Sequence, residues 1–308
     1  MPPKTVLALI EDTAKQLTDA GLSLANGFGQ GTLTAFDEAA WLVLWALKLP
    51  LDSLDLVSNR PVVTVEYKEV AMLLGARIET RKPLAYLTKE AWLQGVAFYV
   101  DERVIIPRSF IAELITNESI DPWLSEDTHR VLDLCTGNGS LAILAAMAWP
   151  EVVIDAADIS IDALAVARIN VDTYTLQNRI TLLASDGLAG CKGLQNGGYD
   201  LILCNPPYVS ASRMAALPAE FKAEPALALA GNAQGGTDGM DFIRGLLLTV
   251  AGQMNENAVL VLEIGNERAH FEHAFPHLEP LWFETSAGAD QVMLLTREQL
   301  IEDLPTKA

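Results

Sequence analysis

Short apolar runs alternate with helical patterns over the last two thirds of the chain. The apolar runs have the length of strands and lie at 130–134, 152–158, 179–184, 199–204, 258–265 and 291–296. Helical patterns follow several of them, for example at 141–149 and 240–254. This alternation predicts an α/β fold with a doubly wound, mostly parallel sheet, in which ligands bind beyond the carboxyl ends of the strands.

The first 89 residues have helical spacing of their apolar side chains. A helix is predicted at 35–49, where Trp41 and Trp45 either fill the core of a small domain or line a substrate groove. A second helix is predicted at 65–76. We expect a separate helical domain in this part of the chain.

A stiff spacer is predicted between the two parts. Side chains alternate at 97–100 and again at 104–106, on either side of the polar residues 101–103, which predicts a β-hairpin. The pattern therefore divides the chain into a helical domain at 1–89, a β-hairpin linker at 90–107 and an α/β domain at 108–308.

The charge of the chain restricts its partners. Forty acidic residues against 21 basic ones give a net charge of −19, which repels phosphate backbones and disfavours a nucleic-acid target. The same charge favours encounter with a basic protein, although a solvated, solubility-promoting surface explains it equally well.

The composition also indicates the compartment. No uncharged run reaches the ~18 residues that span a bilayer, and Met1 to Ile10 does not resemble a secretory segment, so we expect a cytoplasmic protein. Three widely spaced cysteines have no metal-ligand pattern and are expected to be reduced thiols. His270, His273 and His277 cluster, but their neighbours favour a surface helix end over a metal site.

The tetrapeptide Asn205-Pro206-Pro207-Tyr208 directly follows one of the apolar runs. An Asn side chain and rigid proline carbonyls at the end of a strand can hold a planar NH2 group, because that group needs acceptors in one plane. The alternative is a proline turn that closes a buried strand.

A glycine loop after the 130–134 run indicates a nucleotide-like ligand. Gly137 and Gly139 allow close approach of a ligand to the amides at a helix N-terminus. Asp133 can receive a cationic amino group, and Asp158, about 20 residues further on, can bind a ribose diol, although it can also cap the following helix. A ligand with a cationic amine, a ribose and no pyrophosphate fits S-adenosyl-L-methionine, so the inference is methyl transfer.

The run at 179–184 ends at Ser185-Asp186-Gly187. An acceptor and a closely packed backbone at this place would meet an adenine edge, whereas Asp186 can also cap a turn. Ser160 is expected to cap the helix after Asp158, which would leave Asp158 to bind ligand.

The order of these motifs resembles the class I protein-glutamine N5-methyltransferases of the HemK family. The resemblance includes Asp158 with Ile159 and Ser160, the Asn-Pro-Pro-Tyr motif, and the Pro107-Arg108 segment after the expected hairpin, so it covers nearly the whole chain. Within the family, the segment from Pro107 to Ile115 is most similar to the branch that methylates large-subunit ribosomal protein L3. One departure is Cys135, where relatives commonly have glycine.

The resemblance implies a class I, Rossmann-like methyltransferase domain at 108–308 and a substrate-recognition role for residues 1–89. It implies a catalytic site of Asn205, Pro206 and Tyr208, with Pro207 also in contact with the substrate. It implies that S-adenosyl-L-methionine is bound by Asp133, Cys135, Thr136, Gly137, Gly139, Asp158, Ile159, Ser185, Asp186, Gly187 and Asn205, with no metal.

The expected reaction is direct transfer from the sulfonium to a glutamine amide nitrogen of ribosomal protein L3. Three alternatives stay open: a methyltransferase of peptide chain release factors, an amino methyltransferase of adenine or guanine in nucleic acid, and a non-catalytic ribosome-assembly factor that keeps the cofactor fold. A nucleic-acid enzyme should carry a basic, aromatic recognition region, which residues 1–89 lack.

Overall fold

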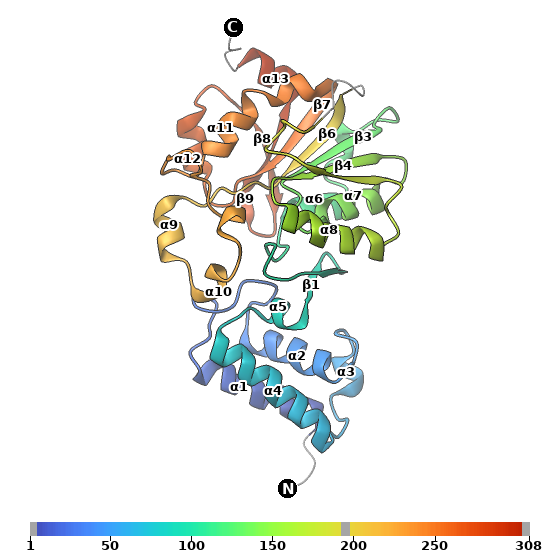
Figure 1. Ribbon diagram of the computed structural model, residues 1–308, viewed down its shortest axis with the longest axis vertical. Helices are drawn as coiled ribbons and strands as arrows, with labels where there is room; N and C mark the ends of the chain where they lie inside the picture. Colours follow the sequence, from blue (N-terminus) through green and yellow to red (C-terminus); the bar gives the residue numbers. More distant parts are fainter. Residues whose placement is uncertain (1–4, 192–197, 304–308) are drawn as a thin grey trace. The chain divides into compact units, whose positions relative to one another are not determined.

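The computed structural model describes residues 5–191 and 198–303, and the chain separates into two compact units (Figure 1). The helical unit comprises the described residues of Met1–Ala91 together with Val100–Glu102 and Leu217–Glu224. The sheet unit comprises the described residues of Trp92–Tyr99, Arg103–Ala216 and Pro225–Ala308. Each unit has a hydrophobic core of its own.

The helical unit is built from short helices around the core residues of α2. Its helices are α1 (Val6–Asp19), α2 (Ala35–Ala46), α3 (Leu54–Val57), α4 (Thr64–Thr80), α5 (Leu84–Thr88) and α10 (Ala219–Lys222). Thr34 begins α2 by accepting a hydrogen bond from the Asp37 amide at 3.1 Å, as an N-cap residue does. Trp41 and Trp45 pack against the core, which favours their structural interpretation.

A buried ion cluster holds the Leu217–Glu224 segment in the helical unit. Arg77 is fully buried and donates to Glu38 Oε1 at 2.7 Å, to Glu220 Oε1 at 3.1 Å and to the Gly27 carbonyl at 2.7 Å. Arg81 donates to the same Glu220 oxygen at 2.5 Å. Burial acts to raise the pKa of Glu220, but the hydrogen bonds from Arg81 and Arg77 outweigh it and leave that pKa lowered. Glu220 is therefore ionised in this cluster.

The hairpin lies earlier than the sequence pattern indicated. Its strands are β1 (Glu90–Leu93) and β2 (Val96–Tyr99), and the turn is Gln94-Gly95, with φ values of 50° and 74°. Two central residues with positive φ suit a tight two-residue hairpin turn. The chain does turn at Glu102-Arg103, but 104–106 forms no strand, so the prediction of a hairpin around 101–103 was wrong. The alternation at 97–100 belongs mostly to β2, the second strand of the observed pair.

The sheet unit contains a seven-stranded sheet of order β5-β4-β3-β6-β7-β9-β8. The strands are β3 (Arg130–Leu134), β4 (Val153–Asp158), β5 (Ile180–Ala184), β6 (Tyr199–Cys204), β7 (Met254–Glu263), β8 (Leu281–Thr285) and β9 (Gly288–Thr296). The first five in this order are parallel, whereas β9 is antiparallel to both of its neighbours. The predicted doubly wound, mostly parallel sheet is confirmed.

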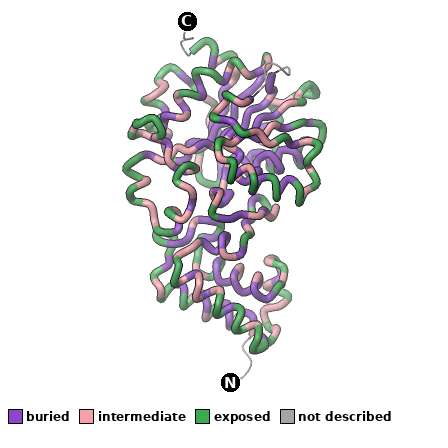
Figure 2. Tube along the Cα trace, viewed as in Figure 1, coloured by how far each residue is buried: buried purple, intermediate pink, exposed green. Residues whose placement is uncertain are grey.

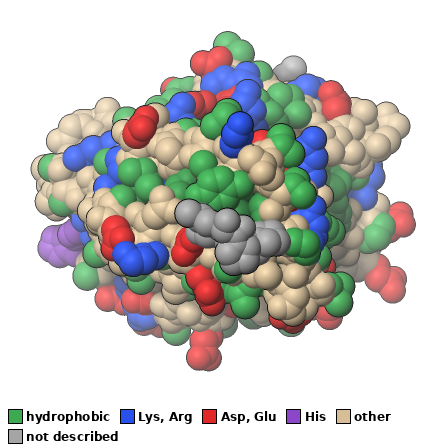
Figure 3. Space-filling model, turned by 90° about the horizontal axis from the view of Figure 1, so that it is seen from below, with side chains coloured by type: hydrophobic (Ala, Val, Ile, Leu, Met, Phe, Trp, Pro, Cys, Tyr) green, Lys and Arg blue, Asp and Glu red, His purple; other side chains and the backbone are tan. Residues whose placement is uncertain are grey.

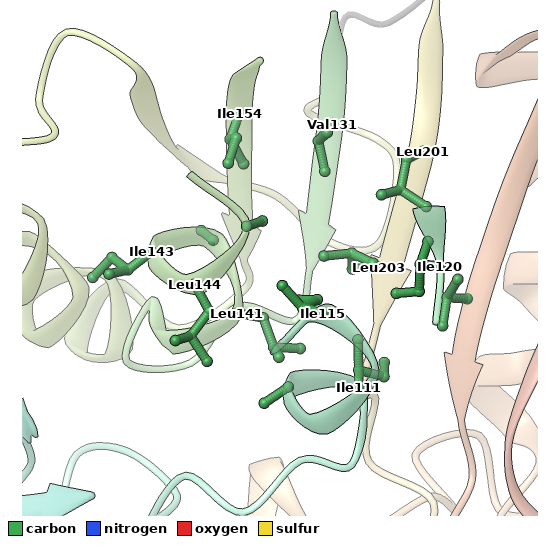
Figure 4. Close-up of a cluster of buried hydrophobic side chains, with 14 of the residues drawn as sticks. Ile111, Ile115, Ile120, Val131, Leu141, Ile143, Leu144, Ile154, Leu201 and Leu203 are labelled. Atoms are coloured by element: carbon green, nitrogen blue, oxygen red, sulfur yellow. The ribbon is translucent and has the colours of Figure 1, made fainter. Parts of the chain in front are cut away.

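Helices cover both faces of this sheet because alternate strand residues are apolar on both sides. One face packs on α6 (Ile111–Thr116), α7 (Ser140–Ala148) and α8 (Ile161–Thr173), and Figure 4 shows its side chains, with Val131, Ile154 and Leu201 pointing toward these helices. The other face packs on α11 (Asp241–Leu247), α12 (Arg268–Ala274) and α13 (Arg297–Glu302). Strands buried on both faces are typical of parallel sheets, and Figure 2 shows the central strands mostly as buried, whereas the edge strands β5 and β8 are more exposed.

The remaining described helices are short. They are the 3₁₀ helices η1 (Asp121–Trp123), η3 (Ala226–Ala228) and η4 (Val250–Gln253) and the α-helix α9 (Ala211–Ala216). The helix expected at 240–254 is thus α11 followed by η4.

The surface mixes apolar and charged side chains. Figure 3 shows exposed hydrophobic side chains between acidic and basic ones on one face, and Leu56 and Met72 are among the most exposed of the helical unit. Among residues 5–191 and 198–303, no helix is both long and apolar enough to cross a bilayer. The first four residues of the Met1–Ile10 segment lie outside the described residues.

Candidate active site

Four neighbouring parallel strands end at one edge of the sheet, and each delivers part of the predicted site there. Asp133 and Asp158 lie at the ends of β3 and β4, while Ser185 and Asn205 directly follow β5 and β6. The pairing of Leu134 with Ala157 and Cys204 keeps these ends level. The structure thus brings these residues to one edge of the sheet, which is the usual place of ligands in such sheets.

The loop between β3 and α7 needs residues that accept a left-handed backbone. Cys135, Gly137 and Gly139 have φ values of 64°, 56° and 82°. A Cβ added at Gly139 would lie 3.3 Å from the Cβ of Ala167, so a larger residue would require α8 to shift by a few tenths of an ångström. Cys135 therefore adopts a conformation that is free for glycine but costly for other L-residues.

The thiol of the half-buried Cys135 lies beside the buried Cys204 thiol. Its hydrogen bond with Cys204 and its burial raise the pKa of Cys135 well above the ordinary value, with nearby carboxylates adding to the effect. The thiol therefore stays protonated, and nothing in its surroundings favours a reactive thiolate.

Only one of the two carboxylate oxygens of Asp133 is hydrogen-bonded to described residues. Its Oδ2 accepts from Thr136 Oγ1 at 2.5 Å and from the Ala142 amide at 3.0 Å, which holds the loop and the first turn of α7. Its Oδ1 is buried and has no hydrogen-bond partner among the described residues. Burial raises the pKa of Asp133 to about 7, against the pull of these two hydrogen bonds, and the charge of Asp158 adds to the rise. A buried acceptor without a partner suits a cationic donor such as an amino group.

Asp158 holds the same loop from the next strand. Its Oδ2 accepts from the Gly137 amide at 2.9 Å and its Oδ1 from the Ser160 amide at 2.8 Å. Ser160 caps α8 by accepting from the Ala163 amide at 3.1 Å, so the predicted cap is confirmed. Asp158 is half-buried and Ile159 is exposed beside it. The ribose role of Asp158 stays a prediction.

Ser185 shapes the loop after β5. Its hydroxyl donates to the Gly187 carbonyl at 2.6 Å and accepts from the Gly190 amide at 2.8 Å. The Asp186 side chain is exposed and makes no hydrogen bond to any described residue, although its carbonyl accepts from the Ala189 amide. The backbone of Asp186 therefore closes the turn, and its carboxylate is left for another partner.

The Asn-Pro-Pro-Tyr motif after β6 has an Asn side-chain amide that makes no hydrogen bond to the described residues. Asn205 is half-buried between the buried residues Cys204 and Pro206, and no described residue hydrogen-bonds its side chain. Pro207 and Tyr208 are also half-buried. The Asn205 amide is thus held at the sheet edge while its donor and acceptor atoms stay free for a ligand.

The glycine-rich segment that follows packs directly on this motif. A Cβ at Gly239 would lie 2.1 Å from the Tyr208 carbonyl oxygen, so no other residue fits there without a shift of the backbone. Asn232 donates to the Val209 carbonyl at 3.1 Å and accepts from the Gly239 amide at 2.8 Å. Asn232 and Gly239 therefore hold this segment against Tyr208 and Val209, whereas Leu217–Glu224 belongs to the helical unit.

The sequence analysis missed one residue of this region, Glu263. It lies at the end of β7 and is almost fully buried, and its carboxylate hydrogen-bonds the Tyr208 hydroxyl. The signal was available, because a single acid interrupts an otherwise apolar run at 258–264. Of the predicted histidine cluster, His270 of α12 pairs with Glu267 at 2.6 Å. Within 5–191 and 198–303, no group of three or more His, Cys, Asp and Glu side chains could hold a metal ion.

Curated relatives match almost the whole chain. A ribosomal protein uL3 glutamine methyltransferase of Bordetella pertussis is 48% identical over 299 residues, which are 96% of each chain. Proteins of the same name from Burkholderia pseudomallei and Neisseria meningitidis serogroup B are each 45% identical, and cover 97% and 96% of this chain and 96% and 94% of their own. The chain belongs to this family of glutamine methyltransferases.

Two further comparisons agree with a methyltransferase fold. The family model described as "Methyltransferase small domain" matches residues 118–232. The hMettl16 catalytic domain, solved in complex with MAT2A 3′UTR hairpin 1, has a TM-score of 0.51 at 13% identity and covers 83% of this chain and 90% of its own, which shows the fold alone. The predicted enzyme class and its cofactor, S-adenosyl-L-methionine, are confirmed by the family.

The raised pKa of Asp133 gives a prediction for stability. Between the ordinary pKa near 4 and the folded-state pKa of about 7, the Asp133 side chain holds a proton in the folded protein but not in the unfolded chain. The contribution of Asp133 to the free energy of unfolding therefore falls as pH rises through that window. We expect the difference in unfolding free energy between wild type and Asp133→Asn to change between pH 5 and pH 8, in the direction that favours the variant at pH 8. Urea unfolding of both proteins at both pH values measures it, and a difference independent of pH would contradict the assignment.

Proposed function

We propose that the protein transfers a methyl group from S-adenosyl-L-methionine to the side-chain amide nitrogen N5 of a glutamine in large-subunit ribosomal protein uL3. The observation that carries this proposal is the uncommitted Asn205 amide at the sheet edge of a chain 48% identical to a uL3 glutamine methyltransferase over 96% of both lengths. The proposed place of action is the cytoplasm, and the proposed recognition of the substrate belongs to residues 1–89.

The sheet edge fits the cofactor. The partnerless Oδ1 of Asp133 would accept from its amino group, and the half-buried carboxylate of Asp158 would bind its ribose. The left-handed Gly137 and Gly139 let the loop backbone come close to it, and the exposed carboxylate of Asp186 would meet its adenine. The remaining predicted contacts are those of Cys135, Thr136, Ile159, Ser185, Gly187 and Asn205. When bound, S-adenosyl-L-methionine supplies an electrophilic methyl group.

The residues after β6 would solve the chemical problem of a weak nucleophile. An amide nitrogen reacts poorly because its lone pair is delocalised into the carbonyl, so the enzyme must orient it. Asn205 Oδ1 and the Pro206 carbonyl would accept the two N–H bonds of the substrate amide, which turns the nitrogen toward the methyl group and stabilises positive charge as it develops. Tyr208 would cover the planar amide, and Pro207 would keep the acceptors rigid. The excess proton leaves to water after transfer.

The charge of the chain supports a basic protein as the substrate. A net charge of −19 attracts a basic ribosomal protein at long range and disfavours a nucleic acid, whose phosphates need Lys and Arg to neutralise them. This argument opposes the adenine or guanine alternative. It does not separate uL3 from peptide chain release factors, which stay the second candidate because the same amide chemistry serves both.

The test is methyl transfer with labelled S-adenosyl-L-methionine to three purified substrates in parallel: uL3, a release factor and ribosomal RNA. We expect label in uL3, located on a glutamine side chain by peptide mass spectrometry, and at least about 100-fold slower labelling of the others. Label in the release factor alone would keep the mechanism and overturn the substrate. Label in RNA alone would overturn the glutamine reaction.

A further inference from the structure

Glu263 joins three parts of the sheet unit through one buried carboxylate. Its Oε2 accepts from the Ser109 hydroxyl at 2.5 Å, from the Phe110 amide at 2.9 Å and from the Ile111 amide at 3.4 Å. These donors surround the start of α6, while Glu263 itself ends β7. The carboxylate also hydrogen-bonds the hydroxyl of Tyr208. One side chain therefore connects the central sheet, the first turn of α6 and the Asn-Pro-Pro-Tyr motif.

The ring of Tyr208 is fixed at two further places. A Cβ at Gly265 would lie 2.6 Å from Tyr208 Cε2 and 3.0 Å from Cζ, so the ring edge lies directly on the backbone after β7. The backbone of Tyr208 lies equally close to Gly239. With the backbone, the ring edge and the hydroxyl all held, the ring has little freedom to turn or tilt.

We propose that Glu263 is a positioning residue for methyl transfer, which holds the Tyr208 hydroxyl and thereby sets the plane of the ring beside Asn205. The inference rests on the proposed function, because it gives the ring the task of covering the substrate amide. A planar amide must meet Asn205 and Pro206 in one plane, and a wall that tilts would let the amide turn away from it. Glu263 acts through Tyr208 and does not itself touch the substrate.

The charges around the pair favour the direction of this hydrogen bond. Burial and the nearby Glu263 raise the pKa of the Tyr208 hydroxyl, so it stays protonated and donates. Burial raises the pKa of Glu263 to about 7, while its bonds with Ser109, Ile111 and Phe110 and the charge of Arg108 oppose the rise. Glu267 is the other carboxylate that acts on Tyr208, and its effect is through charge alone.

A double-mutant cycle tests the proposal. Tyr208→Phe removes only the hydroxyl, and Glu263→Gln keeps the shape of the side chain but replaces the carboxylate with an amide. We expect each single variant to lower kcat by about 10-fold or more with the cofactor KM changed less than about 3-fold. Because Tyr208→Phe removes and Glu263→Gln weakens the same charge-assisted bond, the double variant should lose at most about 3-fold beyond the worse single variant. Glu267→Gln, which removes the other nearby charge, should stay within about 3-fold of wild type.

Losses that multiply in the double variant would overturn the proposal, because Glu263 would then act apart from Tyr208. Thermal unfolding and cofactor binding of each variant identify any general loss of fold.

A second measurement needs no substrate. In protein with ¹³C-labelled tyrosine rings, the Cζ signal of Tyr208 is identified by its absence in Tyr208→Phe, and it should shift clearly more in Glu263→Gln than in Glu267→Gln, because Glu267 acts on the hydroxyl only through its charge. An unshifted signal would overturn the proposal even if uL3 proves not to be the substrate. A shifted signal without uL3 methylation would remove only the proposed function.

Discussion

Asn205→Ala is expected to lower kcat by about 10²–10³-fold while the dissociation constant of S-adenosyl-L-methionine changes by less than about 3-fold. The variant removes the side-chain oxygen that orients the substrate nitrogen, and this oxygen acts mainly as charge develops in transfer. Cys204 and Pro206, which flank Asn205, are buried and keep the loop in place. Single-turnover transfer measures the chemical step, and titration calorimetry measures the cofactor.

Asn178→Ala provides the matched control, since Asn178 is an exposed residue of the same type in the turn before β5. It should leave both constants unchanged. If Asn205→Ala weakened cofactor binding as much as it slowed transfer, Asn205 would be a cofactor ligand and not the residue that orients the amide.

Arg77→Met is expected to have the largest effect on stability. Without Arg77, Glu38 keeps its buried carboxylate and loses the cation that neutralises it, and Glu220 retains Arg81 alone. Breaking a buried ion pair by removing one partner costs about 3–5 kcal/mol, because a charge stays in a poorly solvated place. Urea unfolding followed by tryptophan fluorescence should report this loss, since Trp41 and Trp45 pack on the core of the same unit.

Two other variants test whether the loss of stability in Arg77→Met comes from the buried ion cluster. Lys15→Met removes an exposed pair with Asp19 and should cost less than about 0.5 kcal/mol. Adding Glu38→Gln to Arg77→Met removes the stranded charge, since Glu220 keeps Arg81, and should recover a large part of the loss. If Arg77→Met lowered the free energy of unfolding no more than Lys15→Met does, the buried ion cluster would not contribute the stability proposed for it.

The parts of the fold that the sequence predicted are those with local signals. Apolar runs marked β3, β4, β5 and β6, and polar residues at their ends marked the site, because neighbouring parallel strands bring their ends to one edge. Ser160 was predicted as a cap from its place before a helical pattern. The uncommitted oxygen of Asp133 and the hydrogen-bond-free amide of Asn205 needed the structure, because a sequence does not show which lone pairs are already taken.

Three features were missed or misplaced by the prediction from sequence, because they depend on contacts between distant residues or on a choice between similar local patterns. The edge strand β8 was not predicted, since it is short and partly exposed, so its side chains gave no continuous apolar run. The hairpin was misplaced because two polar segments competed for the turn, and the backbone of Gln94-Gly95 suited it better than 101–103. Glu263 was assigned only to a strand, because its partners Ser109 and Tyr208 are far from it in the chain.

The buried ion cluster also sets an order of events during synthesis. Arg77 and Glu220 are 143 positions apart, so a ribosome adding about 5–20 residues each second finishes the helices around Arg77 roughly 7–30 s before it makes Glu220. During that interval Arg77 can pair with Glu38 but not with its second carboxylate. The N-terminal helices should therefore stay loosely packed on the ribosome and close only after the segment that follows Tyr208 has emerged.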